Sequence, residues 1–152
     1  MAIAITQVSK RAEYALRTAI ELAAAPDRYV PAEQLARAQN IPGKLVAAIL
    51  PHLGRSGLVR SQRGPDGGFR LARPAAETTL ADIIRAVDSR FPNAPSDPPG
   101  NVTYPGPAEP LRRVWVALRT SGPSFLETVT LADIVSGELS LPGGPSYYSR
   151  TS

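Results

Sequence analysis

The chain has 152 residues, 43% hydrophobic and 20% charged, which is enough for one domain with a core plus a modest appendage. It has no cysteine and one histidine, His52, which excludes disulfides, thiolate-held iron–sulfur clusters, cysteine-bearing zinc sites and a histidine-rich metal site within one chain. No apolar run reaches the length of a membrane span, and the first residues lack a signal-peptide pattern. We therefore expect a cytoplasmic protein with no membrane partner.

The positive charge is concentrated in the first half of the chain. The formal net charge is +4, but residues 1–74 alone carry +6 and residues 75–152 carry −2. This asymmetry favours a polyanionic partner for the N-terminal half. The alternative is a soluble protein whose basic residues merely keep it hydrated.

The first predicted helix spans residues 8–25, where apolar residues recur with helical period. Ser9 is its candidate N-cap, because a serine hydroxyl can accept a hydrogen bond from an unpaired N–H group of the first turn. Three basic residues lie outside the apolar stripe: Lys10, Arg11 and Arg17.

Two shorter helices follow, over residues 31–39 and 44–55, and a connector containing Pro42 and Gly43 joins them. The expected core positions of the later helix are Leu45, Ile49, Leu50 and Leu53. Two short helices joined in this way are typical of a helix–turn–helix, in which the second helix reads DNA.

The 44–55 helix is thus the candidate recognition helix, and its candidate DNA-contacting residues are Lys44, Ala47, Ala48 and Arg55. Lys44 could reach a guanine edge or a phosphate, and Arg55 a phosphate. The two alanines can offer thymine only a methyl contact, so hydrogen-bonded base recognition looks sparse. Pro51 should kink the helix, and a plain core helix remains the alternative.

A β-hairpin is predicted next, with strands at 58–62 and 69–72 around Gly64-Pro65-Asp66-Gly67-Gly68. Its arginines are Arg60, Arg63, Arg70 and Arg73. Arg63, beside Gly64 at the tip, is placed to enter a minor groove. The alternative is a solvated, arginine-rich surface hairpin. The glycines do not form a phosphate loop, because no Lys-Ser/Thr ending follows and a strand comes next.

The remaining elements are a helix over 80–88 capped by Thr79, a helix over 110–121, a short piece over 124–127 and a last helix over 131–135. Residues 89–110 contain seven prolines and should bury little, as a loop or disordered linker. We see no internal repeat. The apolar stripe expected to form a dimer interface comprises Leu111, Val114, Trp115, Leu118 and Phe125. Packing within one subunit is the alternative.

The order of these segments resembles the Rrf2 family of bacterial winged-helix regulators, which includes IscR-, NsrR- and CymR-like proteins. The most specific match is the hairpin motif Arg63-Gly64-Pro65 with Gly67-Gly68-Phe69-Arg70-Leu71. Further matches are Tyr14-Ala15-Leu16-Arg17, Ile41 through Leu53, Thr79-Leu80, Trp115 and Thr130-Leu131-Ala132-Asp133-Ile134.

The resemblance implies a mainly α fold with a small β-hairpin wing, that is, a winged helix–turn–helix DNA-binding domain plus a long dimerisation helix. The implied division is 1–88 for the DNA-binding domain, 89–109 for a Pro-rich loop, 110–136 for dimerisation and 137–152 for a flexible tail. It also implies a homodimeric transcription regulator, usually a repressor, on an inverted-repeat operator. The implied DNA contacts are Lys10, Arg11, Lys44, Ala47, Ala48, Arg63 and the neighbours of Arg63 in the wing.

Two departures from the family matter. Cluster-binding members carry three cysteines between helix four and the long helix, where this chain has none, so thiolate cluster sensing is not possible. Ala47, Ala48 and Pro51 also replace positions that are commonly polar, so base specificity does not carry over.

Two functions of different classes stay open: a cluster-free DNA-binding regulator, and a winged-helix protein–protein adaptor that has lost DNA binding. A small-molecule effector bound between helix four, the 89–110 loop and the long helix is compatible with the regulator. We expect no enzyme and no cofactor, since no catalytic constellation can be assigned around the single histidine.

Overall fold

The structure, a computed structural model, describes residues 9–88, 104–121 and 123–139. The chain is mainly helical with one two-stranded antiparallel hairpin, as the sequence predicts. In chain order the elements are α1 (Lys10–Ala23), α2 (Ala32–Gln39), α3 (Gly43–Arg55), β1 (Val59–Gln62), β2 (Gly68–Leu71), α4 (Leu80–Val87), α5 (Leu111–Ser121) and α6 (Leu131–Ser136). Short 3-10 helices lie at Ala75–Glu77, Gly106–Ala108 and Pro123–Glu127. The predicted tail and most of the predicted Pro-rich loop lie outside the described residues.

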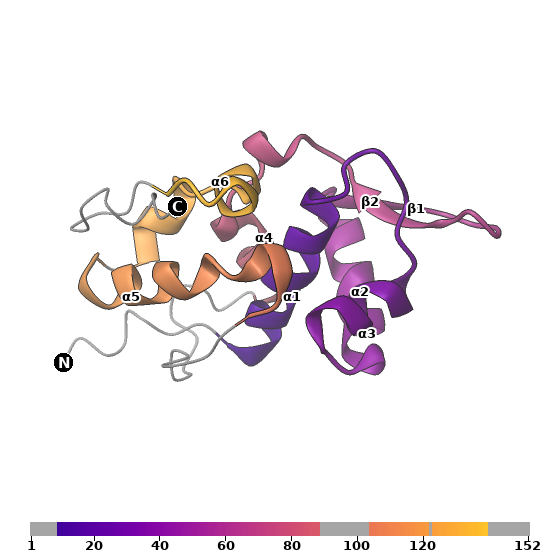
Figure 1. The fold of residues 1–152 in the computed structure, drawn as a ribbon, viewed down its shortest axis with the longest axis horizontal. Helices are drawn as coiled ribbons and strands as arrows, with labels where there is room; N and C mark the ends of the chain where they lie inside the picture. Colours follow the sequence, from indigo (N-terminus) through magenta and orange to yellow (C-terminus); the bar gives the residue numbers. More distant parts are fainter. Residues whose placement is uncertain (1–8, 89–103, 122, 140–152) are drawn as a thin grey trace.

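The hairpin extends from one end of the molecule, and α5 lies at the opposite end (Figure 1). Between them, α1 packs against α4, α2 and α3. The apolar stripe of α1 forms the centre of the core, where Leu16 and Ile20 are fully buried together with Ile83 and Ile84 of α4. The 3.6-residue period of α1 sets its apolar face toward the core, and its neighbours cover most of the rest of the helix, so that only Lys10 and Arg11 in the first turn are exposed.

Local sequence explains where the first three helices begin and end. The Ser9 hydroxyl accepts a hydrogen bond from the Ala12 N–H at 3.0 Å, which is the predicted cap. Helix α2 starts after Pro31 and ends at Asn40, whose φ of 57° is tolerated by asparagine better than by most residues. Helix α3 continues through Pro51 to Arg55 as one helix.

Two glycines fix how the hairpin meets the rest of the domain. A Cβ on Gly67 would lie 2.1 Å from the Gln62 carbonyl oxygen, and one on Gly68, at φ 143°, would lie 2.4 Å from the Val30 carbonyl carbon. Only glycine permits these approaches. Val30 and Phe69 exchange both backbone hydrogen bonds at 2.8 Å, so the connection between α1 and α2 pairs with β2.

The expectation of no internal repeat is wrong. The pentapeptide Thr-Leu-Ala-Asp-Ile occurs at 79–83 and at 130–134, where it starts α4 and α6. Each copy forms a capping box, in which the threonine hydroxyl accepts from the aspartate N–H and the aspartate carboxylate accepts from the threonine N–H. The two copies also pair: Leu80 N–H donates to the Val129 carbonyl and Leu131 N–H to the Thr78 carbonyl, both at 2.9 Å. A repeat of five residues is too short to be distinguished in the sequence from a chance match.

The expectation that the 89–110 segment buries little is wrong for its described end. Tyr104 is 4% exposed and Ala108 is fully buried. The 3-10 helix that contains Ala108 packs against α1 and α6. Proline prevents a long helix here, but it does not prevent a compact segment whose aromatic and small side chains enter the core.

Candidate nucleic-acid interface

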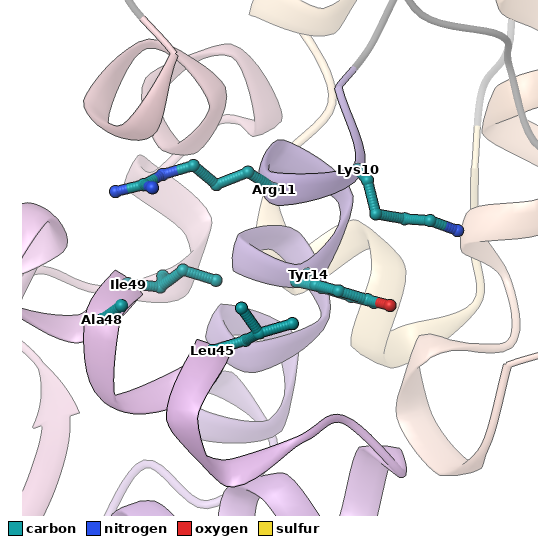
Figure 2. Close-up of a pocket in the computed structure, with 6 residues that line it drawn as sticks. All are labelled: Lys10, Arg11, Tyr14, Leu45, Ala48 and Ile49. Carbon is teal, nitrogen blue, oxygen red and sulfur yellow. The ribbon is translucent and has the colours of Figure 1, made fainter.

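An open hollow of about 240 Å³ lies between the N-terminal half of α1 and the outer face of α3. Its lining is mainly aliphatic and aromatic, formed by Tyr14, Leu45, Ala48 and Ile49. Two cations, Lys10 and Arg11, stand at its border. Figure 2 shows Lys10 and Arg11 extending in opposite directions from the first turn of α1, with Leu45 of α3 reaching toward Tyr14. The hollow is thus a concave apolar surface bordered by positive charge.

The candidate residues of the recognition helix lie on its outer side. Lys44, Ala47, Ala48 and Arg55 are all exposed. Lys10 is also exposed, at 72% of its side chain, although it lies 3.8 Å from the Glu13 carboxylate. Lys10 and Arg11 of α1 thus form a positively charged surface at the hollow, and Lys44 and Arg55 add exposed positive charge near the two ends of α3. Exposed cations of this kind suit phosphate contacts.

The placement of Leu45 in the core is wrong. Its side chain is 41% exposed, and Val46 is fully buried instead. The inner positions of α3 are Val46, Ile49, Leu50 and Leu53, which follow the i, i+3, i+4, i+7 pattern of one helix face. Leu45 is one position out of phase with this pattern. Both Leu45 and Val46 are apolar, so composition alone cannot choose between them.

At the hairpin tip, Arg63 and Gly64 are exposed, and Gly64 has a φ of 104°. Only glycine adopts this conformation without strain, so the turn depends on it. The turn between β1 and β2 projects away from the helices (Figure 1).

Arg70, which the sequence grouped with these cations, has partners inside the chain. Its guanidinium donates to the Pro26 carbonyl at 2.7 Å and lies 5.3 Å from the centre of the Tyr29 ring. These contacts join β2 to the connection between α1 and α2. The structure therefore places Arg70 apart from the surface around the hollow.

His52 lies near this surface on α3. Its ring Nδ1 is 3.0 Å from an Arg55 guanidinium nitrogen. Partial burial, together with the positive charges of Arg11 and Arg55, lowers the pKa of His52 below its ordinary value. The imidazole is therefore neutral at pH 7, and the charge of this region comes from its arginines and lysines.

A buried polar network lies further along α1. Arg17, which the sequence placed outside the apolar stripe, is only 8% exposed. Its Nε donates to the Gln39 side-chain oxygen at 3.2 Å, and an Nη donates to the Gln39 backbone carbonyl. Gln39 in turn donates to Glu21 at 2.7 Å and to the Pro105 carbonyl at 3.0 Å. The network thus joins α1, the end of α2 and the segment before α5.

A second set of buried hydrogen bonds reaches α5, and Arg17 adjoins it, 5.0 Å from the centre of the Tyr104 ring. The Tyr104 hydroxyl donates to the buried Glu13 carboxylate and accepts from the Trp115 indole N–H at 2.8 Å. Burial and the Glu13 carboxylate raise the pKa of Tyr104, so the phenol remains protonated and keeps donating. Sequence reasoning missed this cluster. Its one signal is that Glu13 and Arg17 adjoin the apolar stripe of α1.

The stripe expected at a dimer interface is buried within the single chain. Leu111 and Val114 are fully buried, Trp115 is 1% exposed and Phe125 is 7% exposed. The Leu118 side chain lies outside the described part. The apolar character of the α5 stripe is therefore accounted for by its own chain.

The residues in hand do not fit a thiolate-held cluster, because the chain has no cysteine. Within 9–88, 104–121 and 123–139, no three His, Cys, Asp or Glu side chains are grouped so that they could hold a metal ion. Among these same residues, no helix is long and apolar enough to cross a membrane.

Comparison with known proteins identifies the family. The Rrf2 family model, described as an iron-dependent transcriptional regulator, matches residues 8–137. A putative HTH-type transcriptional regulator, Rv1287 of Mycobacterium tuberculosis, is 42% identical over 134 residues, which cover 88% of this chain and 83% of that protein. The HTH-type transcriptional regulator IscR of Cereibacter sphaeroides is 28% identical over 138 residues, covering 88% of this chain and 89% of its own.

Solved structures agree with this assignment. CymR, the global cysteine regulator of B. subtilis, superposes with a TM-score of 0.64 at 27% identity, over 86% of this chain and 96% of CymR. IscR of T. potens gives a TM-score of 0.62 at 25% identity, over 85% of each chain. Together with the winged helix–turn–helix and its cationic face, these matches show that the chain belongs to the Rrf2 family of DNA-binding, non-enzymatic transcriptional regulators.

Proposed function

We propose that this protein is a sequence-specific repressor that binds an inverted-repeat operator as a homodimer, without an iron–sulfur cluster. The observation that carries the proposal is the set of exposed cations on α1 and α3, where Lys10 and Arg11 line the hollow and Lys44 and Arg55 lie near the two ends of α3. Arg63 and Gly64 at the exposed hairpin tip extend the same role to the adjacent groove.

In this proposal α3 lies in the major groove, and cations of α1 and α3 contact phosphates on either side of it. The hairpin tip reaches the neighbouring minor groove. A symmetric dimer then places two such units on the two halves of a palindromic site.

The dimer takes one of two forms. Either the outer face of α5, where Val116 is 52% exposed, contacts a second chain, or two chains exchange the 104–121 segment. In an exchange, Leu111, Val114 and Trp115 of this segment would pack on the partner's core instead of their own. Sedimentation at micromolar concentration tests the dimer, and a stable monomer would contradict it.

The region between α4, residues 89–109 and α5 is where we place an effector, a small molecule or a protein signal. Tyr104 and Pro105 support this, because they connect this region by hydrogen bonds to α1 and α2 of the DNA-binding domain. A ligand that moved Tyr104 would therefore disturb the helix that carries Lys10 and Arg11.

Selection of bound genomic fragments, with and without a metabolite extract, tests operator and signal together. The repressor proposal expects enrichment of a few sites that share an inverted repeat, and reduced transcription from promoters that contain them. The second candidate, a protein–protein adaptor, is favoured by the lack of hydrogen-bonding side chains at Ala47 and Ala48. It expects no fragment to be retained at physiological salt.

A further inference from the structure

The part of α3 that faces outward between its cations is apolar. Leu45 is 41% exposed, and Ala47 and Ala48 are exposed beside it. Helix α3 contains no Asn, Gln, Asp, Ser or Thr within Gly43–Arg55, so the side chains that most often read adenine and cytosine edges are missing. Of its polar side chains, only Lys44 lies in the first turns of the helix.

The hollow beside these residues has the same character. Leu45, Ala48, Ile49 and the ring of Tyr14 line it, while Lys10 and Arg11 stand at its border (Figure 2). An occupant of this surface must be apolar where it enters and negatively charged where it passes the border.

B-form DNA meets both requirements in one place. Phosphates flank the major groove, and the thymine C5-methyl is the apolar group that its base edges present there. The major groove also admits an α-helix such as α3. We propose that Leu45, Ala47 and Ala48 select the operator by contacting thymine C5-methyl groups, the hollow beside Leu45 receiving one of them.

This inference rests on the proposed function and deepens it, because it names what the recognition helix reads. Lys44 and the border cations supply affinity for any duplex, and the aliphatic patch of Leu45, Ala47 and Ala48 supplies the discrimination. Specificity then comes from the presence of thymine at defined positions of each half-site. It does not come from paired hydrogen bonds to guanine or adenine.

The first test uses a probe that needs no known operator. A genomic fragment library is amplified once with dTTP and once with dUTP, which lacks the C5-methyl group, and each library is selected on the full chain. We expect specific fragments to be enriched from the thymine library and the enrichment to be lost from the uracil library.

The second test is a double-mutant cycle on a selected duplex. Replacing one contacted thymine by uracil should weaken wild-type binding about fourfold, the factor expected for burying one methyl group. The Leu45→Ala variant should lose a similar factor on the thymine duplex and should no longer distinguish thymine from uracil at the position that Leu45 contacts. Any uracil effect that persists in Leu45→Ala belongs to the DNA itself.

Two control variants separate the causes. Lys44→Ala should weaken binding while keeping the full thymine–uracil ratio, and Val135→Ala, a comparable truncation of an exposed aliphatic side chain on α6, should change neither. Thermal unfolding of each variant confirms that the domain is folded.

The outcomes are distinct. If neither library yields enriched fragments, DNA binding itself fails and the proposed function is overturned. Should both libraries yield the same fragments with equal affinity, DNA binding stands and the thymine inference is overturned. Leu45→Ala binding as tightly as wild type to the thymine duplex would also overturn it, and would point to an acidic, apolar protein partner for this surface.

Discussion

Arg11 and Arg17 lie on the same helix and outside the same apolar stripe, yet their surroundings differ completely. Arg11 is exposed beside the hollow, whereas Arg17 is 8% exposed and donates twice to Gln39. The exposed cation is free to meet phosphates. The buried one has exchanged water for protein partners, so its removal leaves polar groups unpaired inside the molecule. The contrast shows that two arginines of one helix can have different roles according to their position along it, since only the first turn of α1 is exposed.

The largest difference is expected when the same substitution, arginine to methionine, is made at the buried and at the exposed position. Arg17→Met should lower the free energy of unfolding by about 3 kcal/mol, because the Gln39 carbonyl and side-chain oxygens lose their donors in a buried site. Arg11→Met should change it by less than about 0.5 kcal/mol, as is usual for an exposed residue. Guanidinium unfolding measures both. Equal losses of unfolding free energy in the two variants would contradict the distinction between the buried and the exposed arginine.

A second pair compares two arginines of the hairpin. Arg63→Ala should cost about 2 kcal/mol of DNA-binding free energy, more on A·T-rich flanks with narrow minor grooves, and should leave thermal stability unchanged. Arg70→Ala should instead lower stability by about 1 kcal/mol, because the Pro26 carbonyl loses its donor. Fluorescence anisotropy and thermal unfolding separate the two. If Arg63→Ala binds operator and scrambled DNA like wild type, the wing does not contact DNA.

Lys44 allows a test of what an exposed cation of α3 contacts. If Lys44 holds a phosphate, Lys44→Ala should weaken binding to all duplexes by about 1 kcal/mol and reduce the salt slope by about one. If it reads guanine, the loss should fall on the operator alone. Anisotropy on operator and scrambled duplexes at two salt concentrations measures this, and an unchanged affinity on both would exclude Lys44 from the interface.

The smallest expected effect concerns Asp82, whose carboxylate is neither as buried as Arg17 nor as exposed as Arg11. The pKa of Asp82 is lowered overall. Partial burial acts to raise it, but this is outweighed by hydrogen bonds that the carboxylate accepts from Thr79 and from the Arg73 guanidinium. The folded state therefore favours the charged form, so this stabilisation is complete above about pH 4 and is lost as the pH falls through the folded-state pKa. Asp82→Asn should remove less than about 1 kcal/mol at pH 7 and flatten the acid limb of the stability profile. An unaltered acid limb would contradict it.

Much of the fold follows from local pattern. Helix periods, the Ser9 and Thr79 caps and the glycine-rich turn predict the elements, and the exposed positions of Lys44, Ala47, Ala48 and Arg63 agree with expectation. The interior of the site does not follow from pattern. Arg17 pairs with Gln39 and Glu13 with Tyr104, and both partners are distant in sequence. The hydrophobic period of a helix does not predict which charged residue beside its apolar stripe will be covered by a distant segment.

The paired copies of Thr-Leu-Ala-Asp-Ile bear on how the chain folds as it is made. Leu80 and Thr78 find their backbone partners in Val129 and Leu131, about fifty residues later in the chain. Contacts of such separation form late, because the intervening chain must first be closed into a loop. On the ribosome, the N-terminus of α4 therefore cannot complete its hydrogen bonds until α6 has emerged. The first half of the chain therefore completes these hydrogen bonds only when nearly all of the described residues have been synthesised, so its folding depends on the integrity of the C-terminal segment.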